Sequence, residues 1–106
     1  MGSPVLNICQ YRVKPGKEAE MESLLAKHWP ALHAAGLVDD TPAVVYRGLS
    51  DPHHGAERCY VEMFSWKDAS GPQLAHKTPG VMAIWEPMGA ICEHMDFPSY
   101  ERLDLA

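Results

Sequence analysis

Apolar and polar positions along the chain change their spacing several times, and each change predicts the boundary of an element. Val5–Val13 carries apolar or β-favouring residues on both alternating faces, which is typical of a strand. From residue 17 to residue 35 the apolar positions recur every three or four residues, so this segment is predicted to be a helix. Pro30 lies inside the segment and is expected to kink or split the helix near residues 26–29, because proline lacks a backbone donor.

The rest of the chain continues the succession of strands and helices. Residues 43–49 and 58–66 are predicted strands, joined by a polar hairpin loop over residues 50–57. Residues 67–86 carry a helical pattern in two pieces, and residues 90–97 are predicted to form a fourth strand. The order β-α-β-β-α-β predicts an α+β fold of ferredoxin-like topology with a four-stranded antiparallel sheet. At 106 residues the chain has room for one domain, residues 1–106.

The ends of the second helical region carry the usual boundary residues. Asp68 or Ser70 is expected to cap the first piece, and Thr78 the second. Pro87 and Gly89 are expected to end the second piece, because neither residue favours a helix interior. The fourth strand should therefore begin soon afterwards.

The first and third predicted strands are apolar on both faces. Leu6 and Ile8 alternate with Cys9 and Tyr11 in the first strand, and the third strand repeats the pattern. Two helices cover only one face of a four-stranded sheet, so the other face of a monomer should be polar. An uncovered apolar face of this size exceeds what monomers usually expose. We therefore expect a second copy to cover it, giving a homodimer in which two sheets form one α+β barrel.

Composition and charge narrow the partners and the compartment. Nine basic and fourteen acidic residues give a net charge of −5, which argues against nucleic acid or an anionic membrane as partner. No apolar run is long enough to span a bilayer, and the first four residues lack a signal-peptide pattern. Three cysteines without a close pair indicate neither a disulfide framework nor a zinc ribbon. A cytoplasmic protein is expected.

Three segments together resemble a known family. They are the turn at residues 13–18, residues 64–68 at the end of the third strand, and residues 75–79 running on to Trp85. In order and spacing they resemble the antibiotic biosynthesis monooxygenase-like family of dimeric α+β barrels. The resemblance implies a pocket between the sheet and the helices of each monomer. It also implies one of several chemistries: cofactor-independent oxygenation of polyketide or quinol substrates, haem degradation, cyclisation or isomerisation.

The haem-degrading branch of the family is disfavoured. Members of that branch carry an asparagine on the first strand, and a tryptophan and a haem-ligating histidine on the second helical region. Cys9 lies where the asparagine would be, although Asn7 is on the same face two residues earlier. His76 lies near the tryptophan position, and Trp85 lies near the position of the haem ligand. No haem or other cofactor is therefore expected.

Three polar residues are the candidates for catalysis. His76 titrates near neutral pH and can take a proton from a phenol or quinol, and the resemblance places the matching position at the pocket. Asn7 is an amide in an otherwise apolar strand, so it either binds a ligand or bonds to neighbouring groups. Tyr46 can donate to a substrate oxygen. The alternatives are a backbone-bonded His76 and a core-packed Tyr46.

A larger set of residues suits a flat aromatic ligand, with plain core packing as the alternative for each. His28 belongs to it because it lies on the apolar stripe of the first helix, where a satisfied core histidine is the competing interpretation. Glu62 lies mid-strand and, if buried, would need Arg12, Arg58 or His94 as its partner. The predicted substrate-binding residues are His28, Trp29, Met63, Trp66, Met82 and Trp85.

These residues favour a cofactor-independent monooxygenase that acts on a small aromatic, quinol or polyketide-like molecule. A cyclase or isomerase on the same scaffold is the first alternative, and a non-catalytic small-molecule-binding module is the second. No group of histidine, cysteine and acidic residues has the spacing of a metal site, so no metal is expected.

Overall fold

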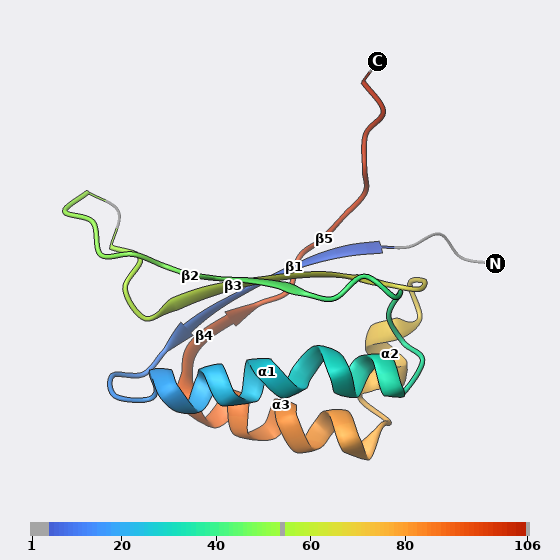
Figure 1. Ribbon diagram of the computed structural model, residues 1–106, viewed down its shortest axis with the longest axis horizontal. Coiled ribbons are helices and arrows are strands. Elements are labelled where there is room, and N and C mark those ends of the chain that lie inside the picture. Colours follow the sequence, from blue (N-terminus) through green and yellow to red (C-terminus); the bar gives the residue numbers. More distant parts are fainter. Residues whose placement is uncertain (1–4, 54, 106) are drawn as a thin grey trace.

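The computed structural model describes residues 5–53 and 55–105, so the first four residues, for which no signal-peptide pattern was found, lie outside it. Its helices and strands follow the predicted order, with a short extra strand at the end (Figure 1). The elements are β1 (Val5–Val13), α1 (Glu18–Ala34), β2 (Val44–Arg47), β3 (Cys59–Trp66), α2 (Gly71–Ala75), α3 (Pro79–Ile91), β4 (Cys92–Asp96) and β5 (Ser99–Tyr100).

The strands form one antiparallel sheet in the order β2-β3-β1-β4. This is the strand order of a ferredoxin-like fold, so the predicted α+β class and topology are confirmed. β5 is a difference from the prediction: it pairs with Leu6 and Asn7 at the beginning of β1, while β4 pairs with the end of the same strand. α1 and α3 lie together on one side of the sheet (Figure 1).

Both helices run through a proline that was expected to interrupt or end them. α1 continues past Pro30, and α3 continues past Pro87 and Gly89. A proline inside a helix costs about 3 kcal/mol. Burying one large apolar side chain contributes about 1.5–3 kcal/mol. Met88 and Ile91 are both buried beyond Pro87, so tertiary packing outweighs the local cost, and β4 begins two residues later than predicted.

The predicted caps are at the right positions but do not act as side-chain caps. Ser70 and Thr78 are the N-cap residues of α2 and α3, and neither side chain bonds a free amide of its helix. The Thr78 hydroxyl instead donates to the Leu74 carbonyl at 2.8 Å, and the Asp68 carboxylate accepts the Ser70 amide at 2.8 Å. The chain therefore turns tightly between β3 and α3, and Gly71 at the beginning of α2 lies close to the Trp66 side chain.

The core lies between the sheet and the helices, and three polar side chains are buried inside it. Alternate residues of β1 and β3 face this side, as their burial pattern shows. The apolar core includes Tyr11, Val13, Phe64 and Trp66 from the strands and Met21, Leu32, Val81 and Met88 from the helices. The buried polar side chains are Asn7, His28 and Glu62, which are 4%, 1% and 0% exposed.

The opposite face of the sheet is open and largely apolar. Leu6, Val44 and Tyr46 are exposed there, and Ile8 and Met63 are half-buried. Their common side follows from the register, which pairs Ile8 with Met63 and Met63 with Val44. The expectation of apolar side chains on both faces is met in the single chain. Separately, no helix in the described part of the chain is long and apolar enough to cross a membrane.

Candidate functional site

A cavity of about 220 Å³ lies between the sheet and the helices, where β1, β3 and the end of β4 face α2 and α3. Its wall is mainly aromatic, with polar groups at separate points. The lining residues are Asn7, Cys9, His28, Phe64, Trp66, Pro72, His76, Trp85, Met95, Phe97 and Ser99. The cavity therefore brings together five residues selected from the sequence: Asn7, His28, Trp66, His76 and Trp85.

A chain of buried hydrogen bonds crosses the molecule behind this cavity. The Tyr11 hydroxyl on β1 donates to Glu62 Oε1 on β3 at 2.8 Å. His28 Nδ1 on α1 lies 2.8 and 3.0 Å from the two carboxylate oxygens of Glu62. The indole N–H of Trp85 on α3 donates to His28 Nε2 at 2.8 Å. Four elements are thus joined through polar side chains inside an apolar core.

The direction of each bond follows from what the groups can donate. An indole N–H only donates, so Nε2 of His28 accepts and carries no proton. The ring proton is then on Nδ1, which donates to the Glu62 carboxylate. Burial, and the neighbouring Glu62 charge after it, raise the pKa of Tyr11 well above its usual range, so its hydroxyl remains a donor. Each polar side-chain atom in this chain of hydrogen bonds therefore has a partner of the right kind, a donor facing an acceptor.

The local sequence explains how Glu62 and His28 come to face each other. Glu62 alternates with Tyr60 and Phe64 along β3, and this register turns all three toward the helices. His28 lies on α1 between Leu25 and Leu32, on the stripe that faces the sheet. The sequence pattern placed His28 on the apolar stripe of its helix and Glu62 in the middle of a strand, and left the burial of Glu62 open. The pairing could not be predicted, because the two residues are 34 positions apart in the chain.

The partners expected for Glu62 were wrong. Arg12 instead donates to the Gly55 carbonyl at 3.3 Å, and Arg58 pairs with Glu93 at 2.6 Å. His94 pairs with Arg12 in the β-sheet register and is exposed on the other face. Arg12 and His94 belong to the open face of the sheet, and Arg58, which precedes β3, is paired with Glu93. The partner of Glu62 is instead His28, which the sequence analysis did not consider for this role.

The second polar part of the cavity surrounds Asn7. Its amide nitrogen donates to Cys9 Sγ at 3.1 Å, and its amide oxygen accepts the Ser99 hydroxyl at 3.2 Å. Burial raises the pKa of the Cys9 thiol to about 12, so the sulfur is a neutral, weak acceptor. Ser99 belongs to β5, the strand that the sequence pattern did not predict. Asn7 is thus held by neighbouring side chains at the edge of the cavity.

His76 lies at the cavity wall on the C-cap of α2, and it is exposed to solvent. Its ring meets the Trp85 indole edge to face, with centroids 4.9 Å apart. No hydrogen bond to its ring nitrogens occurs within the described residues. Trp66 forms the opposite wall against Phe64, with centroids 5.1 Å apart. Its indole N–H is buried and has no hydrogen-bond partner in the described part of the chain.

Four other residues predicted for the site lie away from this cavity. Tyr46 and Met63 are on the open face of the sheet, as the β2–β3 register shows. Met82 is half-buried on α3 and does not line the cavity. Trp29 lines a separate groove. In a single chain, Tyr46 therefore does not converge with Asn7 and His76.

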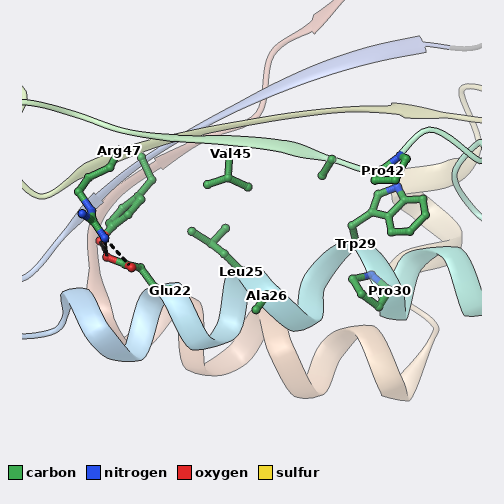
Figure 2. A pocket seen from close by; sticks show the side chains of 10 residues that line it. Glu22, Leu25, Ala26, Trp29, Pro30, Pro42, Val45 and Arg47 are labelled. Carbon is green, nitrogen blue, oxygen red and sulfur yellow. Dashed lines mark hydrogen bonds and ion pairs between the residues drawn. The ribbon is translucent and has the colours of Figure 1, made fainter.

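The separate groove runs between α1 and the edge strand β2, and Figure 2 shows the side chains that line it. It is larger, at about 490 Å³, but its charged groups are already paired. Glu22 binds Arg47 at 2.6 Å and accepts the Tyr60 hydroxyl at 2.6 Å. The Tyr60 bond, followed by Arg47, lowers the pKa of Glu22. With no unpaired titratable group among its lining residues, this groove offers less chemistry than the aromatic cavity.

Comparison with known proteins identifies the fold. No family model and no curated protein matches the sequence. Among solved structures, SnoaB of Streptomyces nogalater, a cofactor-independent oxygenase, is 18% identical with a TM-score of 0.75 over 98% of each chain. A candidate antibiotic biosynthesis monooxygenase of Bordetella bronchiseptica is 16% identical with a TM-score of 0.73, covering 95% of this chain and 98% of the other.

The fold is that of the antibiotic biosynthesis monooxygenase-like proteins. The resemblance inferred from the sequence is thereby confirmed. The same fold includes At3g17210 of Arabidopsis thaliana, which is 10% identical with a TM-score of 0.77, covering 97% of this chain and 99% of the other. At such low sequence identities, the similarity to these structures establishes the fold alone. The chemistry has to be argued from the cavity.

Proposed function

We propose that this chain is a cofactor-independent monooxygenase that acts on a small hydroxylated aromatic molecule of the quinol or polyketide type. The observation that carries the proposal is the aromatic cavity with a histidine at its wall and an amide at its edge. At about 220 Å³ it is smaller than the roughly 300–1,000 Å³ of drug-sized ligand sites, so one or two fused rings fit it best. SnoaB, with the same fold, is a cofactor-independent oxygenase.

The proposed reaction needs only a base, a dry slot and dioxygen. His76 takes the proton of a phenolic hydroxyl, and the electron-rich anion then reacts with dioxygen directly. For a hydroquinone the balance is complete: two electrons come from its oxidation to the quinone and two from replacement of a ring C–H by C–OH. One oxygen atom enters the product, and the other leaves as water. Asn7 at the cavity edge stabilises the anion through its amide.

Two walls of the cavity support a planar ligand. Trp66 and Phe64 come from β3, and Trp85 comes from α3, so the slot lies between the sheet and a helix. Aromatic rings favour stacked or edge-to-face contacts with a flat substrate. These contacts explain binding without any charged clamp.

The active form is proposed to be a homodimer that pairs through the open face of the sheet. Leu6, Val44 and Tyr46 are between 37% and 55% exposed on that face, which is unfavourable for an isolated chain in water. A second copy placed sheet against sheet would bury them in both chains at once. Sedimentation at micromolar concentration should find particles of twice the 11.8-kDa chain mass. Particles of one chain alone would contradict the proposed pairing.

The catalytic proposal is tested by oxygen uptake with 1,4-naphthohydroquinone, after subtraction of its spontaneous oxidation. Labelled dioxygen should place one labelled atom in the product. His76→Ala should lower kcat by about 10²–10⁴, which is the usual contribution of a general base. Lys77→Ala is the matched control, because Lys77 is the exposed neighbour and does not line the cavity. A His76→Ala rate equal to that of the wild type, or a product of unchanged mass, would contradict the proposal.

A further inference from the structure

The contact between Trp85 and His28 closes one wall of the cavity. Both side chains line the cavity, and the bond between Trp85 Nε1 and His28 Nε2 is 2.8 Å long. The indole N–H of Trp85 can only donate, and Nε2 of His28, which carries no proton, can only accept. This bond is therefore the place in the wall where a donor and an acceptor stand side by side.

The side chain of His28 is fixed by more contacts than the side chain of Trp85. His28 is 1% exposed, its Nδ1 is bound by both oxygens of Glu62, and its ring meets Phe64 edge to face at 5.7 Å. Turning its ring would break the Glu62 bonds inside the core. Trp85 is only half-buried and meets the solvent-exposed His76 on another side. If the contact opens, Trp85 is the side chain that moves.

We propose that a hydroxyl group of the ligand inserts between Trp85 and His28. The hydroxyl donates its proton to Nε2 of His28, and its oxygen accepts the indole N–H of Trp85. One hydrogen bond is thus exchanged for two, and no polar atom of the pair is left without a partner. Glu62 acts through His28 as a positioning residue, because its carboxylate keeps the ring proton on Nδ1 and leaves Nε2 as an acceptor.

This inference deepens the proposed function, on which it rests for the aromatic nature of the ligand. Because His76 is a separate group, an arene diol can place one hydroxyl between Trp85 and His28 and offer the other to His76. The pair then selects hydroxylated rings over their ethers. A methoxy group inserted there would accept from Trp85 but give Nε2 no donor, so Nε2 would be left unpaired. The ether should therefore leave the Trp85–His28 bond closed and bind without the hydrogen bonds that the hydroxyl gains.

The test compares 1-naphthol with 1-methoxynaphthalene on uniformly ¹⁵N-labelled full-length protein by NMR. The free protein should show a scalar coupling between Trp85 Nε1 and His28 Nε2 across their hydrogen bond. Saturating 1-naphthol should abolish this coupling and shift both nitrogens. 1-Methoxynaphthalene should bind at least 10-fold more weakly and leave the coupling intact.

The outcomes separate this inference from the proposed function. If 1-naphthol shifts the Trp66 indole signal but the Trp85–His28 coupling persists, the insertion is refuted and the oxygenase proposal stands. If the insertion occurs but no hydroquinone consumes dioxygen, the oxygenase proposal fails and the hydroxyl site stands. If neither naphthalene binds, or both bind equally well, the inference is wrong.

A variant tests the positioning role of Glu62. In Glu62→Gln the amide N–H can donate to Nδ1, which moves the ring proton of His28 to Nε2 and removes the acceptor. The preference for 1-naphthol should fall to within about 2-fold, with a changed His28 ¹⁵N pattern. Glu86→Gln, an exposed change on α3, is the matched control and should keep the preference. If Glu62→Gln does not fold, the two-ligand measurement on the wild type decides the question alone.

Discussion

A double-mutant cycle on the buried Glu62–His28 pair tests the central structural argument. Glu62→Met and His28→Leu each replace one partner by an apolar side chain of similar size. Either change alone leaves the other polar group in the core, at 0% or 1% exposure. Removing one partner of a buried pair typically costs about 3–5 kcal/mol. A domain of this size has roughly 5–15 kcal/mol of stability in total, so each variant should be severely destabilised.

The double variant should recover most of that loss. Replacing a buried pair by apolar groups is often close to neutral. What remains is the loss of two acceptors: the Tyr11 hydroxyl loses Glu62, at a cost of about 1–3 kcal/mol, and the half-buried indole N–H of Trp85 loses His28. The coupling between the two sites should therefore be at least about 3 kcal/mol. This coupling energy is much larger than the one expected for neighbouring side chains that share no buried hydrogen bond.

Urea unfolding, followed by fluorescence and circular dichroism, measures the cycle. Midpoints should be compared at equal slope and at one protein concentration, because the proposed dimer would make stability concentration-dependent. The exposed pair Glu22–Arg47, with Glu22→Met and Arg47→Leu, is the control and should show a much smaller coupling. If the Glu62 and His28 losses add within about 0.5 kcal/mol, the two groups do not depend on each other and the argument fails.

Two further predictions concern the walls of the cavity. Burial raises the pKa of Cys9 from 9.0 to about 12, so its stabilising effect is complete below pH 9 and is lost as pH rises toward 12. Between pH 8 and pH 11 Cys9 alone should lower the free energy of unfolding by about 3 kcal/mol, and the raised pKa of Tyr11 adds to that loss, so Cys9→Ala should reduce the slope in alkaline urea titrations without abolishing it. Gly71→Ala should cost about 1–3 kcal/mol in urea unfolding, because the new Cβ would lie 2.7 Å from Trp66 Cδ2. Gly80→Ala meets no atom within 4 Å and should be neutral or slightly stabilising, and equal effects at both glycines would contradict the packing argument.

The succession of strands and helices could be predicted because the spacing of apolar residues reports it directly, and the order of strands in the sheet followed from that succession. The ends of the helices could not be predicted. Pro87 and Gly89 carry a local signal to stop, but the chain follows the burial of Met88 and Ile91 instead. β5 was missed because two residues after a proline show no period at all. Local signals therefore predicted the elements, while tertiary packing decided their boundaries.

The site divides in the same way. Asn7, Trp66, His76 and Trp85 stand out in the sequence as polar or aromatic residues on predicted faces, and the cavity brings them together. The Glu62–His28 pair did not stand out, because it depends on the rotation of α1 over β3. Either residue alone is only a buried polar side chain in a pattern. The joint signal was that both lie on faces turned toward the same core, where each needs a partner.

The buried polar chain is better explained by recognition than by stability. Its members could be replaced by apolar side chains at little cost, so packing alone gives no reason for a glutamate at 0% exposure. It does hold the strand register: a slip of one residue in β3 would turn Glu62 to the open face and break its bonds to Tyr11 and His28. Yet apolar side chains at the same positions would also specify register. What only the polar chain provides is an acceptor of fixed tautomer at the cavity wall. A double variant that keeps most of the wild-type stability but binds 1-naphthol and 1-methoxynaphthalene equally well would show this.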